Sequence, residues 1–155
     1  MKKIFLLLFV IMLFGCSSSS DENDLQLSKS ELLILNSPWK LTHHEVLEIT
    51  DLNGTSVTKS QIQGSLNSDT ATRIMIFNDD GTGTTVSEYP GNSPLYGNFT
   101  WTIPNGNKLQ INDNVADSFT VNNNELTFTT SNAEYYQLGT VVKFTVKTFY
   151  NKNNI

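Results

Sequence analysis

The sequence predicts an all-β domain, an antiparallel barrel or sandwich of eight or nine short strands preceded by a short helix. Most segments after Pro38 alternate apolar and polar residues, as strands with one buried face do. Turn-forming pairs such as Asn53-Gly54, Asp80-Gly81 and Asn105-Gly106 separate these segments and favour tight turns. Because closure into a barrel leaves no exposed strand edge, we expect an eight-stranded antiparallel up-and-down barrel.

The first fifteen residues have the composition of a signal peptide. Lys2 and Lys3 precede an uncharged apolar run that is too short for a bilayer, which takes about 20 residues. The junction Leu13-Phe14-Gly15-Cys16 resembles that of bacterial lipoproteins, which implies removal of residues 1–15 and acylation of Cys16. Acyl chains on Cys16 are therefore the expected membrane anchor, since more than one chain gives stable attachment.

Cysteine count and charge exclude several classes of protein. Cys16 is the only cysteine, so the sequence predicts no intramolecular disulfide, no CxxC zinc site and no thiol chemistry. Removing Lys2 and Lys3 with the leader leaves eight basic against fifteen acidic residues, a formal charge of −7. An acidic chain without a basic cluster argues against nucleic acid as a partner.

Residues 16–27 read as a lipidated cysteine and a flexible tether, because they are small, polar and acidic. The serine run followed by Asp21-Glu22 also resembles the export signal of lipoproteins on the outer surface of Bacteroidota, and an ordinary spacer is the alternative. Residues 28–155 then form the folded domain. It begins with a short helix that Ser28 or Ser30 caps and that Ser37-Pro38 ends.

The remaining elements are strands bounded by turn residues, and we expect no second helix. Their predicted ranges are 39–50, 56–60, 72–78, 84–89, 96–103, 108–112, 118–122, 125–130 and 136–150. Alternation is clear in the last of these, where Val142, Phe144 and Val146 share one face and Lys143 and Thr145 the other.

Four stretches resemble the pattern of a known family. They are Ser37-Pro38-Trp39-Lys40-Leu41, the hairpin Ile76-Phe77-Asn78-Asp79-Asp80-Gly81-Thr82-Gly83-Thr84, Phe99-Thr100-Trp101 and Leu109-Gln110-Ile111. Between Leu32 and Tyr150 their order is similar to the lipocalin-like domain of small secreted or lipid-anchored proteins of Bacteroidota. The resemblance implies a lipocalin-like barrel on a lipoprotein of the cell envelope, lipid-anchored at the periplasmic or cell-surface face of the outer membrane.

Two features depart from the pattern of lipocalins proper. Ser37 stands in the place of the glycine before the tryptophan, and Arg73, the only arginine, is not at the closing position. The resemblance therefore supports the barrel more than it supports a bound lipid.

Candidate ligand-binding residues follow from the inward faces of the strands. The set is Trp39, His43, Glu45, Phe77, Phe99, Trp101, Phe128 and Phe144. The aromatic side chains either line a cavity or fill the core, since an eight-stranded barrel is just wide enough for either.

His43 and Glu45 fall on the apolar face of the first strand if its alternation is unbroken, where they would orient the polar end of a ligand. The alternative is a bulge, or a place at the barrel rim, that turns both toward water.

The sequence shows no pattern for metal, cofactor or catalysis. His43 and His44 point to opposite faces of a strand, and the chain has two histidines in all, too few for a zinc site. Asn78-Asp79-Asp80-Gly81 lacks the spacing of a calcium loop and reads as a hairpin turn. Asp69-Thr70-Ala71 resembles a short O-glycosylation motif of Bacteroidota envelope proteins, and whether it is used stays open.

The sequence leaves two candidate functions, and we expect no enzymatic activity. The first is a lipid-anchored binding module of the cell envelope that holds a small apolar ligand in the barrel. The second is a structural or interaction protein of the outer membrane, whose filled barrel binds a protein or glycan through its outer face.

Overall fold

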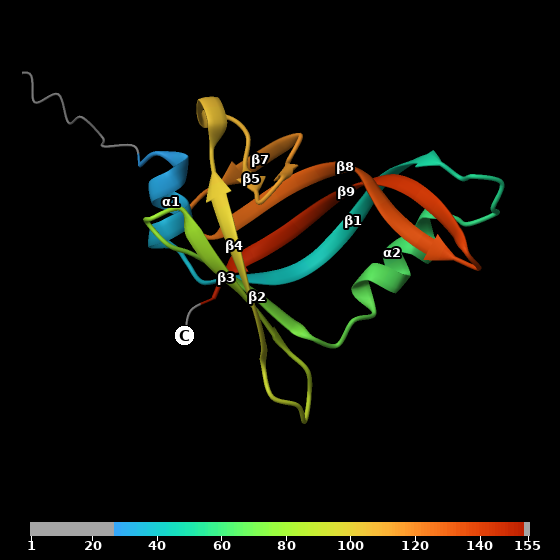
Figure 1. The fold of residues 1–155 in the computed structure, drawn as a ribbon, viewed down its shortest axis with the longest axis horizontal. Helices are drawn as coiled ribbons and strands as arrows, with labels where there is room; N and C mark the ends of the chain where they lie inside the picture. The colour runs from blue at the N-terminus through green and yellow to red at the C-terminus, as the bar shows by residue number, and fades with distance from the viewer. Residues whose placement is uncertain (1–26, 154–155) are drawn as a thin grey trace, which may run out of the picture.

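The computed structural model describes residues 27–153, which form a β-rich domain with two helices (Figure 1). In chain order the elements are α1 (Lys29–Leu35), β1 (Trp39–Asp51), α2 (Lys59–Asn67), β2 (Thr72–Phe77), β3 (Thr82–Glu88), β4 (Leu95–Thr102), the 3-10 turn η1 (Pro104–Gly106), β5 (Gln110–Ile111), β6 (Asn114–Val115), β7 (Ser118–Val121), β8 (Glu125–Gln137) and β9 (Thr140–Lys152). The predicted leader, Cys16 and the tether as far as residue 26 lie outside the described residues.

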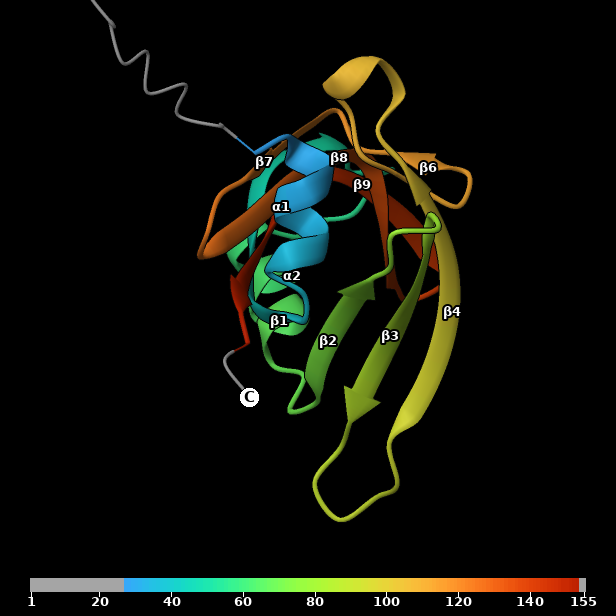
Figure 2. The same ribbon diagram turned by 90° about the vertical axis from the view of Figure 1, so that its left-hand side faces the viewer.

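Nine strands form one antiparallel sheet that curls into a half-barrel (Figure 2), which differs in strand number and in closure from the predicted eight-stranded barrel. The strand order is β6-β5-β4-β3-β2-β1-β9-β8-β7, so every neighbour is sequential except β1 and β9. Consecutive strands pair as in an up-and-down meander, and the first and last strands of the chain, β1 and β9, also pair. The two edges of the sheet are therefore β6 and β7. Of the nine strands, β5 and β6 have only two residues each.

Two residues, Ala116 and Asp117, join the ends of the sheet. Ala116 N–H donates to the carbonyl of Leu109 at 2.8 Å, and Asp117 N–H donates to the carbonyl of Thr129 at 2.9 Å. The connection is thus tied to β8 on one side and to the approach to β5 on the other. We call this junction between the ends of the sheet the seam.

Strands β1, β8 and β9 have thirteen residues each and extend well beyond the shorter strands (Figure 1). The β1–β9 register shifts three times, between Leu41 and His43, between Val46 and Glu48, and between Ile49 and Asp51. Such bulges bend a strand and increase its twist. The long strands therefore contribute to two separate cores.

The N-terminal helix is confirmed, with Ser28 as its cap. Glu31 N–H donates to Ser28 Oγ, and Ser28 N–H donates to the Glu31 carboxylate, which completes a capping box. Leu33 is fully buried against the first core, and its carbonyl accepts a hydrogen bond from Trp39 Nε1 at 2.9 Å. The helix lies between β7 and β2, where it covers one end of the half-barrel (Figure 2).

The second helix, α2, corrects the sequence prediction, which placed a strand at 56–60 and expected no further helix. A capping box between Thr58 and Gln61 starts this helix. Its buried Ile62 packs with Val57, Val46 and Phe144 in a second core beneath the far halves of β1, β8 and β9 (Figure 1). A helix forms here because its face around Ile62 is buried. The β-branched residues around Val57 favour a strand only weakly, so this burial outweighs their preference.

The other strands lie close to the predicted ranges, with two differences. A hairpin turn at Leu138-Gly139 divides the predicted strand 136–150, so β8 continues to Gln137 and β9 begins at Thr140. The two-residue strand β6 was not expected. Neither helix within residues 27–153 has the length and apolarity that crossing a membrane requires.

Candidate functional site

The aromatic residues of the predicted ligand set fill the first core. Trp39, Phe77, Phe99 and Trp101 are all buried, and the Phe77 ring meets those of Phe99 and Trp101 edge-on at 5.3 and 5.4 Å between centroids. Trp101 Nε1 donates to the carbonyl of Thr82 at 2.9 Å. These side chains therefore pack against each other, as edge-to-face aromatic pairs do.

The remaining aromatic residues of the set lie elsewhere. Phe144 is buried in the second core with α2, away from Trp39 and Phe77. Phe128 is only partly buried, and its ring stacks on Tyr150 at 5.7 Å between centroids. The structure thus separates the predicted set into core residues and one residue, Phe128, beside the seam.

His43 and Glu45 are exposed, which confirms the bulge as the alternative for this strand. The register shift between Leu41 and His43 moves both side chains off the buried face. The His43 ring instead stacks on Phe149 of β9, with centroids 4.2 Å apart and planes inclined by 10°. His44 lies on the inward side of β1, in the position that unbroken alternation predicts for His43.

An apolar pocket of about 290 Å³ lies at the seam. Its lining includes Leu109, Ile111 and Val115 from one end of the sheet, Phe128 and Thr130 from β8, and Ala116 between them. Leu109 and Ala116 are buried, whereas Val115 is 44% exposed, so the pocket has an apolar floor and an open mouth. Its size is near the lower limit for small-molecule sites.

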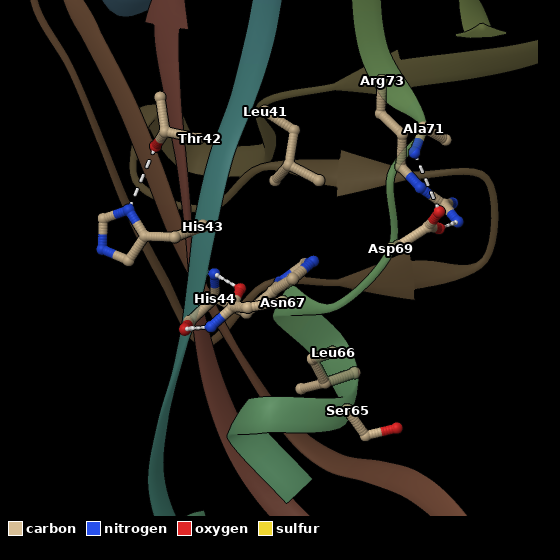
Figure 3. A pocket seen from close by; sticks show the side chains of 10 residues that line it. All are labelled: Leu41, Thr42, His43, His44, Ser65, Leu66, Asn67, Asp69, Ala71 and Arg73. Carbon is tan, nitrogen blue, oxygen red and sulfur yellow. Dashed lines mark hydrogen bonds and ion pairs between the residues drawn. The ribbon is translucent and has the colours of Figure 1, made fainter. Parts of the chain in front are cut away.

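A second and more polar cleft, of about 320 Å³, lies where β1 and β2 separate (Figure 3). Only Trp39 and Lys40 of β1 pair with β2, so beyond Lys40 the edge of β1 faces α2. Asn67, at the end of α2, accepts from His44 N–H at 2.7 Å and donates to the His44 carbonyl at 2.8 Å. The side-chain amide occupies the place of a strand residue and forms one wall of the cleft.

The charged residues of the cleft are Arg73 and Asp69, which form an ion pair across its outer side (Figure 3). Asp69 also accepts from Ala71 N–H at 3.0 Å. The hydrogen bond from Arg73 holds the pKa of the Asp69 carboxyl below its usual value, and the same bond raises the pKa of Arg73. The pair is a fixed donor beside a fixed acceptor with no net charge.

His44 lies on the cleft side of β1, whereas His43 points to the opposite side (Figure 3). Its Nδ1 is 3.1 Å from Thr148 Oγ1. Burial lowers the pKa of His44, and the charge of Arg73 and the neighbouring His43 lower it further. The imidazole is therefore neutral at pH 7. Tyr150, on the same face of β9 as Thr148, is almost fully buried, and burial raises its pKa to about 12.

Sequence reasoning missed the residues of the polar cleft. Asn67 and Ser65 belong to the helix that was not expected, and the inward position of His44 depends on a bulge that leaves no mark in the hydrophobic pattern. Arg73 carried a signal, since it is the only arginine of the chain. Residues 27–153 contain no group of three or more His, Cys, Asp or Glu side chains suited to a metal ion.

Comparison with known proteins adds no relative. No family model matches the chain, and neither the curated proteins nor the solved structures contain a significant match. Any functional assignment therefore rests on the sequence and the structure of this chain.

Proposed function

We propose that the chain is a lipid-anchored binding module of the cell envelope, attached to the outer membrane through acyl chains on Cys16, whose half-barrel takes a small apolar ligand at the seam. The supporting observation is the apolar pocket of about 290 Å³ between the two ends of the sheet. In this proposal the half-barrel is a lipocalin-like up-and-down barrel that stays open between its two edge strands, β6 and β7.

We place the ligand at the seam and not in the middle of the half-barrel, because the side chains in the middle are already packed against one another. Trp39, Phe77 and Trp101 have 6% or less of their surface exposed, so a ligand at that place would have to displace them. Displacing close-packed core side chains costs several kcal/mol. At the seam, Val115 and Phe128 present apolar surface that is not fully covered, and its burial favours an apolar ligand.

A fluorescence titration tests this proposal. N-phenyl-1-naphthylamine is a neutral dye whose emission rises in apolar surroundings, and its 17 heavy atoms at about 0.3 kcal/mol each give a Kd of about 0.2 mM. The variant Thr130→Phe places a ring in the pocket and is expected to abolish the rise. Thr129→Phe is the matched control, because Thr129 is also part-buried but lies on the other face of β8.

Two results would reject the seam as the site. Dye binding that Thr130→Phe leaves unchanged, with the variant folded by circular dichroism, places the dye elsewhere. Absence of any saturable rise when the domain is titrated to about 1 mM into a fixed micromolar concentration of the dye removes the apolar site altogether.

A second candidate, an interaction protein of the envelope, is favoured by the tip of the β8–β9 hairpin. Leu138 is 100% exposed and has φ +50°, a backbone region that favours glycine or asparagine, and the neighbouring Tyr136 is 69% exposed. Leu138 therefore combines a strained backbone with an apolar side chain in water, and its contacts in the structure do not explain this combination as a requirement of folding. A photo-crosslinking residue at position 138 should trap one partner protein in intact cells, and an equal yield from position 123 in the exposed β7–β8 turn would reject this surface.

A further inference from the structure

The polar cleft between β1, α2 and β2 is separate from the seam and combines two kinds of wall. Leu41, Leu66 and Ala71 supply apolar surface, and Arg73, Asp69, His44 and Ser65 supply polar groups (Figure 3). The cleft enters the concave face between the two cores, since His44 and Thr148 separate Val46 and Val146 of the second core from Tyr150 of the first.

The charges of the cleft select against ions. An anion must compete with Asp69 for Arg73, and it meets the C-terminal end of α2, where carbonyl groups carry partial negative charge. A cation meets the positive guanidinium of Arg73. The one acidic residue that lines the cleft, Asp69, is already paired with that guanidinium. Neither ion gains a free counter-charge.

A purely apolar ligand fits no better. Covering Arg73 and Asp69 with hydrocarbon would remove water from both charged groups, and the desolvation cost exceeds what a few apolar contacts return. The cleft therefore calls for a molecule that replaces water at the ion pair.

Hydroxyl groups meet this requirement, because each of them both donates and accepts a hydrogen bond. A hydroxyl can accept from Arg73 and another can donate to Asp69 without separating the pair. Hydrogen bonds to charged groups are stronger than neutral ones. The carbon-bound hydrogens of a saturated ring meanwhile pack on Leu41 and Leu66.

We propose that this cleft binds one neutral, hydroxyl-rich ring, the chemistry of a sugar unit of a glycan, between the Arg73–Asp69 pair and the apolar wall of Leu41 and Leu66. Asn67 fixes the position of His44, and the neutral imidazole adds one further polar contact at the base of the cleft. The site is independent of the seam pocket.

An NMR titration tests the assignment with defined probes. D-glucose, D-galactose, D-mannose and N-acetyl-D-glucosamine are each added to the ¹⁵N-labelled domain up to about 50 mM, since a ligand of about 12–15 heavy atoms is expected to bind in the millimolar range. At least one sugar should shift the amide signals of His44, Asn67 and Ala71 in a saturable way. Inorganic phosphate is added in a parallel titration.

Variants separate this site from non-specific sugar contact. Asp69→Asn and Arg73→Gln should each weaken the sugar at least about fivefold, because each removes one charged partner. Asp80→Asn is the matched control, since Asp80 also accepts from the amide two residues on, Thr82 N–H, at 2.8 Å and should leave the affinity unchanged. Unfolding midpoints of all three variants are measured to show that they are folded.

Three results would overturn the proposal. The first is no saturable shift at the cleft with any of the four sugars, and the second is a shift with phosphate alone, which would make the cleft an anion site. The third is equal weakening by Asp80→Asn and Asp69→Asn. Dye binding at the seam is unaffected by each of these outcomes, so the two proposals fail separately.

Discussion

Replacing Asn67 with alanine removes the side chain that closes the edge of β1. Three residues of α2, spaced four apart and therefore on one face of the helix, reach this edge. Lys59 Nζ donates to the Leu47 carbonyl at 3.0 Å, Gln63 Oε1 accepts from Val46 N–H at 3.2 Å, and Asn67 bonds both the N–H and the carbonyl of His44. The helix thus satisfies backbone groups that a neighbouring strand would otherwise bond.

The size of the effect follows from the two bonds that Asn67 makes. A hydrogen bond contributes a net free energy of about 0.5–1.5 kcal/mol, so two bonds give about 1–3 kcal/mol. Water reaches the His44 backbone once the amide is gone, because these bonds lie in an exposed region, which favours the lower part of that range. We expect Asn67→Ala to lower the free energy of unfolding by about 1–2 kcal/mol.

Urea denaturation of the domain measures this quantity. With a slope of about 2 kcal/mol per molar, the midpoint should fall by about 0.5–1 M and the slope should stay unchanged. Asn123→Ala, in the exposed β7–β8 turn, is the control and should change stability by less than about 0.5 kcal/mol. If Asn67→Ala and Asn123→Ala have the same midpoint, the helix does not stabilise the edge of β1 as described.

Three further perturbations test the packing and the buried titratable groups. Because its pKa is lowered in the fold, neutral His44 should make the wild type lose stability as the pH falls from about 7 through the unfolded value near 6.5. His44→Gln should flatten this part of the urea-midpoint profile, and an unchanged slope would contradict the buried neutral state. Tyr150, with its pKa raised to about 12, should make the domain lose about 2–3 kcal/mol between about pH 10 and 12. Tyr150→Phe should remove this loss, and a loss of the same size in the variant would assign it to other groups. Gly83→Ala should destabilise by about 1–3 kcal/mol, since a Cβ there would lie 2.2 Å from the Phe99 ring and 2.6 Å from a backbone carbonyl. Gly64→Ala in α2, where nothing lies within 4 Å, should instead stabilise by about 0.5–1 kcal/mol, and similar thermal midpoints for the two variants would refute the close packing at Gly83.

Local patterns predicted most of the strands and the first helix. The Asp80-Gly81 and Asn105-Gly106 breaks fall between strands as expected, and Ser28 caps a helix that ends before Pro38. These features depend on residues close in sequence, so they can be recognised without knowing what the chain packs against.

The features that a single sequence did not reveal depend on distant contacts. The α2 face at Ile62 is helical because it is buried on Val46 and Phe144, and the Thr58–Gln61 capping box was the available local signal. The turn at Leu138-Gly139 was missed because leucine, at φ +50°, is not a residue that turns of this kind favour.

The candidate site was predictable only in part. Phe128 was selected for its inward alternation and does line the seam pocket, yet the same criterion selected Trp39 and Phe77, which are core residues. Periodicity identifies the buried face of a strand, but it does not distinguish a side chain that fills a core from one that lines a cavity. Neither could it place the ends of the sheet, which is where the apolar pocket lies.

Methyl NMR of the dye complex tests the central proposal, that the core is filled and the apolar ligand binds at the seam. The domain is labelled at Ile, Leu, Val and Met methyl groups and titrated with N-phenyl-1-naphthylamine. We predict shifts and intermolecular contacts at Leu109, Ile111 and Val115, which line the pocket. Shifts confined to Leu33 and Met75, deep in the first core, would contradict the account and place the ligand inside the half-barrel.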